Sequence, residues 1–307
     1  MSITKVAVAV AANGGYDRPQ ELQAFDDTKA GVKGLREEVV AQVRAAAETA
    51  GFFQVVNHGV PGDAMAAMVA AVARRKMRRS WRDTIFLDME PEPPQPEELP
   101  EALRGVMFEY VGAVRKLSAW LFELLSESLG LAGDRLAEMG CGESLKVYPP
   151  CPEPHLTLGN TKHTDPTFLT VLLQDAVGGL QVLLDHGAAG GGGKAWVNVP
   201  PVPGALIINI GDLLQASTSL YINGRFKSVE HRVLANQSVD TARVSVASFV
   251  DVGRSKRQYG PIEELTSPDG GNPPIYRSVT VEEFIAHFYR KGSEQSRPRL
   301  DYFKLVE

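Results

Sequence analysis

Cysteine and long apolar runs are both scarce in this chain of 307 residues. Its two cysteines, Cys141 and Cys151, are too few for a disulfide framework or a cysteine-rich zinc site. A single bridge between them is chemically allowed, but reduced thiols in a cytoplasmic protein are expected. No apolar run has the length needed to span a bilayer. The apolar stretch 3–12 lacks the features of a signal peptide and is expected to be a disordered or strand-like start.

An excess of positive charge is also absent, because the formal net charge is −5. This balance argues against a nucleic-acid-binding surface. The one dense basic cluster spans residues 74–79 and contains no aromatic residue, so it is expected to be a solvated helix end. With 44% hydrophobic and 22% charged residues, the composition is that of a globular protein with one large domain or two small ones.

The N-terminal half is predicted to be mainly helical. Apolar residues at helical spacing indicate helices over 36–50, 64–75 and 101–129. A short apolar run at 52–56 is typical of a strand, and the Pro/Glu-rich residues 91–100 indicate a loop. The third helix carries an apolar stripe that consists of Val106, Tyr110, Val114, Leu117, Leu121, Leu124 and Leu125.

The pattern changes after residue 145, where short strand-like segments follow one another between turn signals. The predicted strands are 168–174, 180–184, 196–199, 205–210, 229–234 and 244–250. This pattern favours a sandwich or barrel of antiparallel strands. The Gly/Ala run 187–193 is expected to be a flexible loop, and 281–290 a last short helix. The fold class is therefore mainly β with flanking α.

Two of the six histidines stand near an acidic residue in a pattern suited to a metal. His163 and Asp165 are two apart, so on a strand they would project from the same face. His231 opens another predicted strand that could bring it across. Two imidazoles and one carboxylate with open positions are the ligand set of non-haem Fe(II) oxygenases. His58 is expected to have a structural role, while His155, His186 and His287 lack a polar partner at ligand spacing.

A second pair, Arg243 and Ser245, suits the recognition of a carboxylate. The alternative for Arg243 is a surface ion pair. The flanking apolar residues Val244 and Val246 favour a buried arginine, which needs an anionic partner. A co-substrate that chelates iron at one end and carries a carboxylate at the other would use both features, and 2-oxoglutarate (2OG) has that shape.

Several motifs occur together in an order that resembles the plant 2OG/Fe(II)-dependent dioxygenases. They are YPPCP at 148–152, HTD at 163–165, NIGD at 209–212, HR at 231–232 and RVS at 243–245. Residues 16–35, 51–61 and 81–88 are similar to the subgroup of 1-aminocyclopropane-1-carboxylate oxidase homologues, and within it most of all to the cereal benzoxazinoid dioxygenases.

This resemblance implies a double-stranded β-helix, or jelly roll, over residues 141–307 with a C-terminal helix, preceded by a helical region over 1–140. It implies Fe(II) on His163, Asp165 and His231. It also implies 2OG on Tyr148, Arg243 and Ser245, and an organic substrate against Phe249. Asn57, His58 and Asp212 match structural positions of the family.

The implied activity is hydroxylation of a plant specialised metabolite, such as the benzoxazinoid glucoside DIBOA-glucoside. Dioxygen would be consumed, and ascorbate would serve as reductant. No nucleic-acid or membrane partner is expected, and the protein would be a monomer or a weak homodimer.

The chain also departs from the family. A strand of the type I-P-V-I-D-L is missing before the first long helix, and the stretch between Met77 and Trp81 is short. Lys146 and Val147 replace the usual Asn-Tyr before Tyr148, and 187–193 and 217–222 look like additions. One alternative is therefore a member that binds metal and 2OG but has an impaired substrate pocket. Another is a ligand-binding jelly roll with a structural zinc.

Overall fold

A computed structural model describes much of the chain. The described residues are 6–7, 31–74, 87–89, 92–142, 144–148, 160–185, 193–218, 225–234, 243–252, 256–266, 273–291 and 299–305. Outside these ranges lie the basic residues after Arg74, motif residues 149–152, His155, His186 and most of the Gly/Ala run 187–193.

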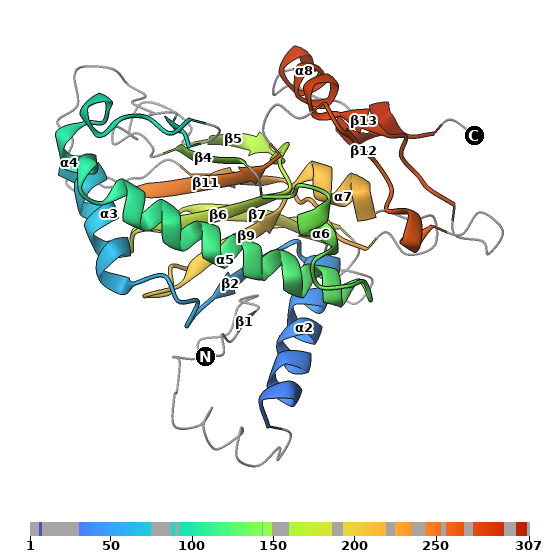
Figure 1. Ribbon diagram of the computed structural model, residues 1–307, viewed down its shortest axis with the longest axis horizontal. Helices are drawn as coiled ribbons and strands as arrows, with labels where there is room; N and C mark the ends of the chain where they lie inside the picture. The colour runs from blue at the N-terminus through green and yellow to red at the C-terminus, as the bar shows by residue number, and fades with distance from the viewer. Residues whose placement is uncertain are drawn as a thin grey trace.

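The larger of two packed sheets forms the frame of the fold (Figure 1). Each of its strands is antiparallel to its neighbours. The order across the sheet is β1 (Val6–Ala7), β2 (Phe52–Val55), β9 (Leu206–Ile210), β6 (Leu169–Gln174), β11 (Ser245–Asp251), β4 (Ser144–Tyr148) and β3 (Leu87–Asp88). Because β1 lies within the apolar stretch 3–12, part of that stretch forms a strand, which was one of the two expected outcomes.

The smaller sheet packs against one face of the larger one. Its order is β5 (Asn160–His163), β10 (His231–Val233), β7 (Leu180–Asp185) and β8 (Lys194–Asn198). Side chains of both sheets, among them Phe52, Ile207, Leu180 and Val182, form a small apolar core between them. Two antiparallel sheets enclosing such a core are the predicted jelly roll. A separate ribbon joins β12 (Gln258–Tyr259) to β13 (Val279–Thr280).

The helix α5 runs across the strands on the other face of the larger sheet (Figure 1). The helical elements are α2 (Gly31–Thr49), α3 (Gly62–Arg74), η1 (Pro96–Glu98), α4 (Glu101–Arg104), α5 (Met107–Ser128), α6 (Arg135–Glu138), α7 (Asp212–Thr218), η3 (Glu263–Leu265), α8 (Val281–Lys291) and η4 (Arg299–Phe303). Within the described residues, no helix combines the length and the apolar character needed to cross a bilayer.

The predicted helix 101–129 forms two helices, α4 and α5, because the helical conformation is interrupted at Gly105. Glycine is a weak helix former, and here it caps the first of the two. The predicted stripe from Tyr110 to Leu125 is fully buried, while Val106 is half-buried at the break. Each such buried aliphatic side chain stabilises the fold by about 1.5–3 kcal/mol.

Strand alternation divides the larger sheet into an apolar face and an inner face. On β6, β9 and β11, residues such as Val171, Ile208 and Val246 point towards the helices and join the main core. The residues between them, such as Thr170 and Asn209, point into the jelly roll. The inner face is therefore where polar side chains can gather without disturbing the main core.

The six predicted strands after residue 168 all exist, with ends shifted by a few residues. A strand was expected to carry both His163 and Asp165, whereas β5 ends at His163. The sequence did not predict β3, β4, β12, β13, α6 or α7. The last of these covers 212–218, so the expected addition at 217–222 begins inside a helix whose Ser217 and Thr218 are buried. The first helix starts at Gly31, five residues earlier than expected.

His58 has the structural role predicted for it. The Val60 N–H donates to its Nδ1 at 3.1 Å, and its Nε2 lies 3.0 Å from the Gly204 carbonyl oxygen. A carbonyl only accepts, so the proton is on Nε2 and the ring is neutral. Burial also lowers the pKa of His58, which keeps it neutral at pH 7.

Gly51 generates a stability prediction, because it joins α2 to β2 with φ of +63° and has no space for a side chain. A Cβ there would lie 2.0 Å from the Lys227 carbonyl oxygen, whereas Gly59, with φ of +78°, has open space around it. Both Gly→Ala changes introduce left-handed strain of roughly 1 kcal/mol. Gly51→Ala should lower the free energy of unfolding by several times the loss in Gly59→Ala, measured by urea unfolding. Equal losses would show that the contact with Lys227 does not limit this position.

Candidate metal centre

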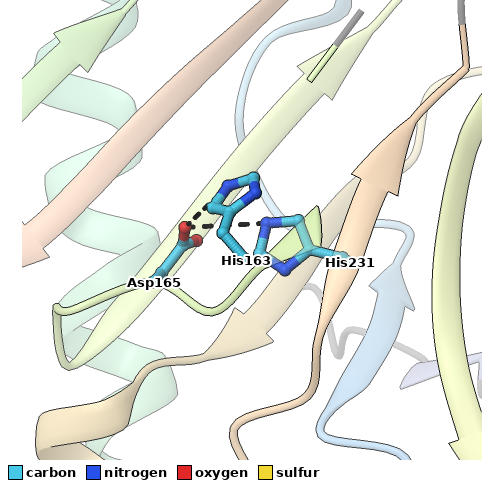
Figure 2. A group of neighbouring side chains, drawn as sticks. All are labelled: His163, Asp165 and His231. Carbon is cyan, nitrogen blue, oxygen red and sulfur yellow. Dashed lines mark ion pairs between the residues drawn. The ribbon is translucent and has the colours of Figure 1, made fainter. Parts of the chain in front are cut away.

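Three potential metal ligands meet where the two sheets approach each other (Figure 2). His163 is the last residue of β5, and His231 is the first residue of β10. The two strands are antiparallel neighbours with His231 opposite His163. Asp165 does not continue the strand as predicted: it lies in the turn that leads to β6. Its carboxylate nevertheless faces both imidazoles, so the grouping was predicted correctly although the strand alternation invoked for it was wrong.

The three side chains present their ligand atoms to one small volume. The Nε2 atoms of His163 and His231 each lie 3.6 Å from Asp165 Oδ1. One ligand atom from each residue lies within 4.8 Å of the others. Among the described residues, no fourth His, Cys, Asp or Glu joins this group. A closed structural zinc site would require a fourth ligand, so the group suits a metal with open positions.

The protonation of the two imidazoles shows that the group fits a cation. His163 Nδ1 lies 2.7 Å from the Thr161 carbonyl oxygen, and His231 Nδ1 lies 3.2 Å from that of Val229. Because a carbonyl only accepts, each Nδ1 carries a proton. In the neutral rings, both Nε2 lone pairs then point at a carboxylate oxygen that is also electron-rich. A cation between them turns this repulsive arrangement into a binding site.

Asp165 is 3% exposed and is held by hydrogen bonds to its other oxygen. Thr170 Oγ1 donates to Oδ2 at 2.6 Å and Asn209 Nδ2 donates to it at 2.8 Å. Burial raises the pKa of Asp165, whereas positive charge at the positions of His231 and His163 and the two hydrogen-bond donors lower it, and the balance lies below its usual value. The carboxylate is therefore ionised, and Oδ1 remains available for a metal.

The NIGD segment supports this turn from β9. Besides Asn209, the Asp212 N–H donates to the Asp165 carbonyl oxygen at 2.8 Å, and Thr164 Oγ1 donates to the Asp212 carboxylate at 2.8 Å. Gly211 has no room for a side chain, because a Cβ would lie 2.0 Å from the Thr167 carbonyl oxygen. The structural role expected for Asp212 is thus an anchor for the turn that carries Asp165.

Arg243 forms a second polar cluster on the same inner face. It is 9% exposed, and its Nη1 donates to Ser245 Oγ at 2.8 Å. Ser245 opens β11, so Arg243 precedes the strand rather than lying on it as predicted. Its Nε donates to the Gly178 carbonyl oxygen, and Nη2 lies 3.4 Å from Gln174 Oε1. In the described part of the chain, no carboxylate forms an ion pair with this guanidinium.

This second cluster fits an incoming carboxylate. Burial lowers the pKa of Arg243, and the charge of Asp175 only partly offsets that effect. Gln174 Nε2 is buried and has no hydrogen-bond partner among the described residues, so another donor is available at the same place. A carboxylate would neutralise the arginine and accept from both side chains. The sequence reading missed Gln174, whose only signal was its place at the end of a predicted strand.

The strand register relates the two clusters to each other. Thr170, which holds Asp165, lies opposite Phe249 of β11, and Gln174 lies opposite Ser245. On this face, the backbone positions of the two clusters are thus four residues apart, which is about 13 Å along the strand. Phe249 is half-buried at the level of the metal ligands. Tyr148 lies on β4 opposite Ala247, between the two levels, and its side chain is outside the described part.

The other histidines lie apart from this site where the structure describes them. His58 binds the backbone near Gly204, and His287 on α8 stacks on Tyr302 with ring centroids 4.0 Å apart. Neither contributes to the group of three, as the sequence indicated.

Comparison with known protein families agrees with this geometry. The profile of the 2OG-Fe(II) oxygenase superfamily matches residues 139–252, which contain both clusters. A second profile, described as the N-terminal region of non-haem dioxygenases in morphine synthesis, matches residues 21–75.

Relatives with known sequences cover almost the whole chain. The 1-aminocyclopropane-1-carboxylate oxidase homologue 1 of Arabidopsis thaliana is 40% identical over 94% of this chain and 97% of its own length. The deacetoxyvindoline 4-hydroxylase of Catharanthus roseus is 38% identical, over 90% and 87% respectively. The first alignment has 371 positions, more than the 307 residues of this chain, so the relative has residues where this chain has none. This agrees with the internal segments that the sequence reading found missing.

Solved structures show the same fold. The crystal structure of JOX2 in complex with 2OG, Fe and JA superposes with a TM-score of 0.75 at 30% identity, over 90% of this chain and 88% of the other. The rice dioxygenase for auxin oxidation gives 0.70 at 27% identity, over 90% and 97%. With identity of 40% to a relative over nearly its full length, the chain belongs to the 2OG-Fe(II) oxygenase superfamily and, within it, to the 1-aminocyclopropane-1-carboxylate oxidase homologues known from plants.

Proposed function

We propose that this enzyme hydroxylates a plant specialised metabolite, a benzoxazinoid glucoside such as DIBOA-glucoside, in a reaction that uses Fe(II), 2OG and dioxygen. In this proposal His163, Asp165 and His231 bind the metal. The observation that carries it is the convergence of two Nε2 lone pairs on a buried, ionised carboxylate at 3.6 Å. When bound, Fe(II) with 2OG and dioxygen supplies the oxidation of a substrate C–H group, and 2OG leaves as succinate and carbon dioxide.

The protein's part is to fix the ligand atoms before any reactant arrives. Backbone carbonyls orient both imidazoles through Nδ1, and Thr170 with Asn209 orients the carboxylate through Oδ2. Phe52 packs edge-on against the His231 ring at a centroid distance of 5.2 Å. A site held in advance in this way needs little rearrangement during the reaction.

Arg243 and Ser245 would hold the distal carboxylate of 2OG, with Gln174 as a further donor and Tyr148 near the other end. The guanidinium is already fixed by the Gly178 carbonyl and by Ser245, so its remaining N–H groups have a defined direction. Its burial excludes water that would weaken the ion pair. The cluster would therefore set the orientation of 2OG relative to the metal ligands.

The substrate assignment rests on resemblance and on the inner apolar surface. Motifs across the chain are similar to those of benzoxazinoid dioxygenases, and one relative is a hydroxylase named for a plant metabolite, deacetoxyvindoline. Half-buried Phe249 lies beside the metal level, where a flat ring could rest on it. Ascorbate would keep the metal reduced between turnovers.

The second candidate is a member that binds metal and 2OG but hydroxylates no such substrate. The observation that favours it is the set of alignment positions at which the relatives have residues and this chain has none. This candidate predicts 2OG turnover that no benzoxazinoid glucoside stimulates.

An activity assay separates the two candidates. The purified protein, supplied with Fe(II), ascorbate and 2OG, should form a hydroxylated product from DIBOA-glucoside, detected by mass spectrometry together with succinate. Asp165→Ala should abolish both products, because it removes one of the three ligands. Asp185→Ala, at the exposed end of β7, should keep full activity.

Two results would contradict the proposal in different ways. Stimulation of 2OG turnover by another phenolic substrate alone would overturn the benzoxazinoid assignment. Full activity of Asp165→Ala would overturn the metal centre itself.

Thr170→Val should weaken metal binding without removing a ligand. Loss of its hydrogen bond frees the Asp165 carboxylate to rotate, and changes to such supporting partners lower metal affinity by about 10–100-fold. The affinity can be measured anaerobically by titration with Fe(II). Thr49→Val, at an exposed position of α2, is the matched control and should bind as the wild type does. Unchanged affinity in Thr170→Val would mean that Asn209 suffices to hold the carboxylate.

Arg243→Lys should raise the KM for 2OG more than it lowers kcat. Lysine keeps the charge but loses the planar pair of donors, and a lost charge-assisted hydrogen bond weakens binding by about 1.5–3 kcal/mol, or roughly tenfold to a hundredfold. Steady-state kinetics at varied 2OG concentration would test this, with Arg44→Lys at an exposed position of α2 as the control. A KM equal to that of the wild type would exclude Arg243 from the 2OG site.

A further inference from the structure

One buried acidic side chain on the inner face has no part in the site described so far. Asp251 ends β11 and is 4% exposed. Strand alternation places it on the same face as Ser245 and Phe249, which points into the jelly roll. Asp and Glu are rarely buried without a partner, so this position calls for an explanation.

The surroundings of Asp251 do not neutralise its charge. Its Oδ1 accepts a hydrogen bond from the Val252 N–H at 2.9 Å, and no cation among the described residues lies within ion-pair distance. Burial raises the pKa of Asp251 to about 6, against the opposing effects of the Val252 hydrogen bond and of the charge of Lys146. At pH 7 the group is mostly ionised. It therefore retains the capacity to accept a further hydrogen bond.

Lys146 reaches the same face from the neighbouring strand. It lies opposite Phe249 in the pairing of β4 with β11. The next residue pair on the same face, two residues along the strands, is Asp251 with Ser144. Paired residues on adjacent strands share a face, and diagonal neighbours are within reach of long side chains. A cation and an acid thus flank the Phe249 position from two strands.

The register places Asp251 on the far side of the metal ligands from Arg243. Asp165 is held by Thr170, which lies opposite Phe249. From that level, Ser245 is about 13 Å along the strand in one direction and Asp251 is about 7 Å in the other. The 2OG cluster and Asp251 therefore lie on opposite sides of the metal level, and Lys146 lies at that level, opposite Phe249.

We propose that Asp251 and Lys146 form the polar end of the organic-substrate pocket and select an uncharged, hydroxyl-bearing aromatic molecule. A hydroxyl of the substrate donates to Asp251, an oxygen of the substrate accepts from Lys146 Nζ, and the ring rests on Phe249. This inference rests on the proposed function, because it names the substrate class of the same site.

The charges of the pair decide between neutral and acidic substrates. Asp251 and Lys146 together carry no net charge, so an uncharged molecule with both donors and acceptors satisfies both groups. A carboxylate substrate would gain from Lys146 but would stand beside a buried carboxylate. Its repulsion by Asp251 is strong in a poorly solvated site.

A binding experiment tests the proposal without requiring turnover. The protein is loaded anaerobically with Fe(II) and 2OG, and phenyl β-D-glucoside and benzoate are titrated separately as probes by ligand-observed NMR. Wild type should bind the glucoside more tightly than benzoate. Asp251→Asn and Lys146→Met should each weaken glucoside binding by about tenfold or more, because each removes a hydrogen bond to a charged group. Melting temperatures and affinity for 2OG should stay unchanged.

The chain offers a matched control for both variants. Asp185 and Lys194 are also a cross-strand pair, at the exposed ends of β7 and β8. Asp185→Asn and Lys194→Met remove the same charges far from the inner face, and both should bind phenyl β-D-glucoside as the wild type does.

The pH dependence gives a readout that a merely structural role would not produce. Because the pKa of Asp251 is about 6, the acceptor is lost as the pH falls through that value. Among the described side chains, the charged neighbour that acts on it is Lys146 on β4. Glucoside affinity of the wild type, relative to that of Asp251→Asn at each pH, should fall between pH 7 and pH 5.

The proposal is overturned if wild type binds no phenyl β-D-glucoside, if it prefers benzoate, or if both variants bind the glucoside as tightly as wild type. None of these results depends on hydroxylation. Failure of the proposed function would instead appear as 2OG turnover that DIBOA-glucoside does not stimulate, or that does not require Asp165.

Discussion

Electron-rich atoms repel one another at the centre of the jelly roll, and the rest of the fold must hold them in place against this repulsion. Two imidazole lone pairs and a carboxylate oxygen would separate if the chain were free to move. Each is held from behind, the rings by backbone carbonyls and the carboxylate by Thr170 and Asn209. Those partners belong to different strands of two sheets, so the site exists only when both sheets are paired in the correct register.

The helices affect the candidate site because their packing determines which face of the larger sheet points inwards. α5 packs on the outer face of the larger sheet and buries residues such as Val171, Ile208 and Val246. Because side chains alternate along a strand, burying these residues forces Thr170, Asn209 and Ser245 to face inwards. The apolar core and the polar site are thus two consequences of one alternation, and the main core fixes the direction of the functional side chains.

Much of this could be predicted from the sequence, and the failures have physical reasons. The strands from residue 168 on and the stripe of α5 follow from periodicity. The grouping of the three candidate metal ligands and the pair Arg243 with Ser245 follow from residue chemistry. The role of Asn209 and the orphaned amide of Gln174 depend on which residues face each other across strands, which one sequence does not state. Asp165 sits in a turn rather than a strand, because the chain must leave β5 to enter the other sheet.

The alternation of side chains on the central strands also limits where a chain with this fold can gain or lose residues. A single residue inserted into β6 or β11 would reverse the faces beyond it, exposing apolar side chains to the interior of the jelly roll and turning functional ones into the main core. The relatives carry residues that this chain lacks, yet β6 and β11 remain paired without a register shift over their described length. A change of length in a connection reverses no face, so the alternation of β6 and β11 restricts such changes to the connections of this fold.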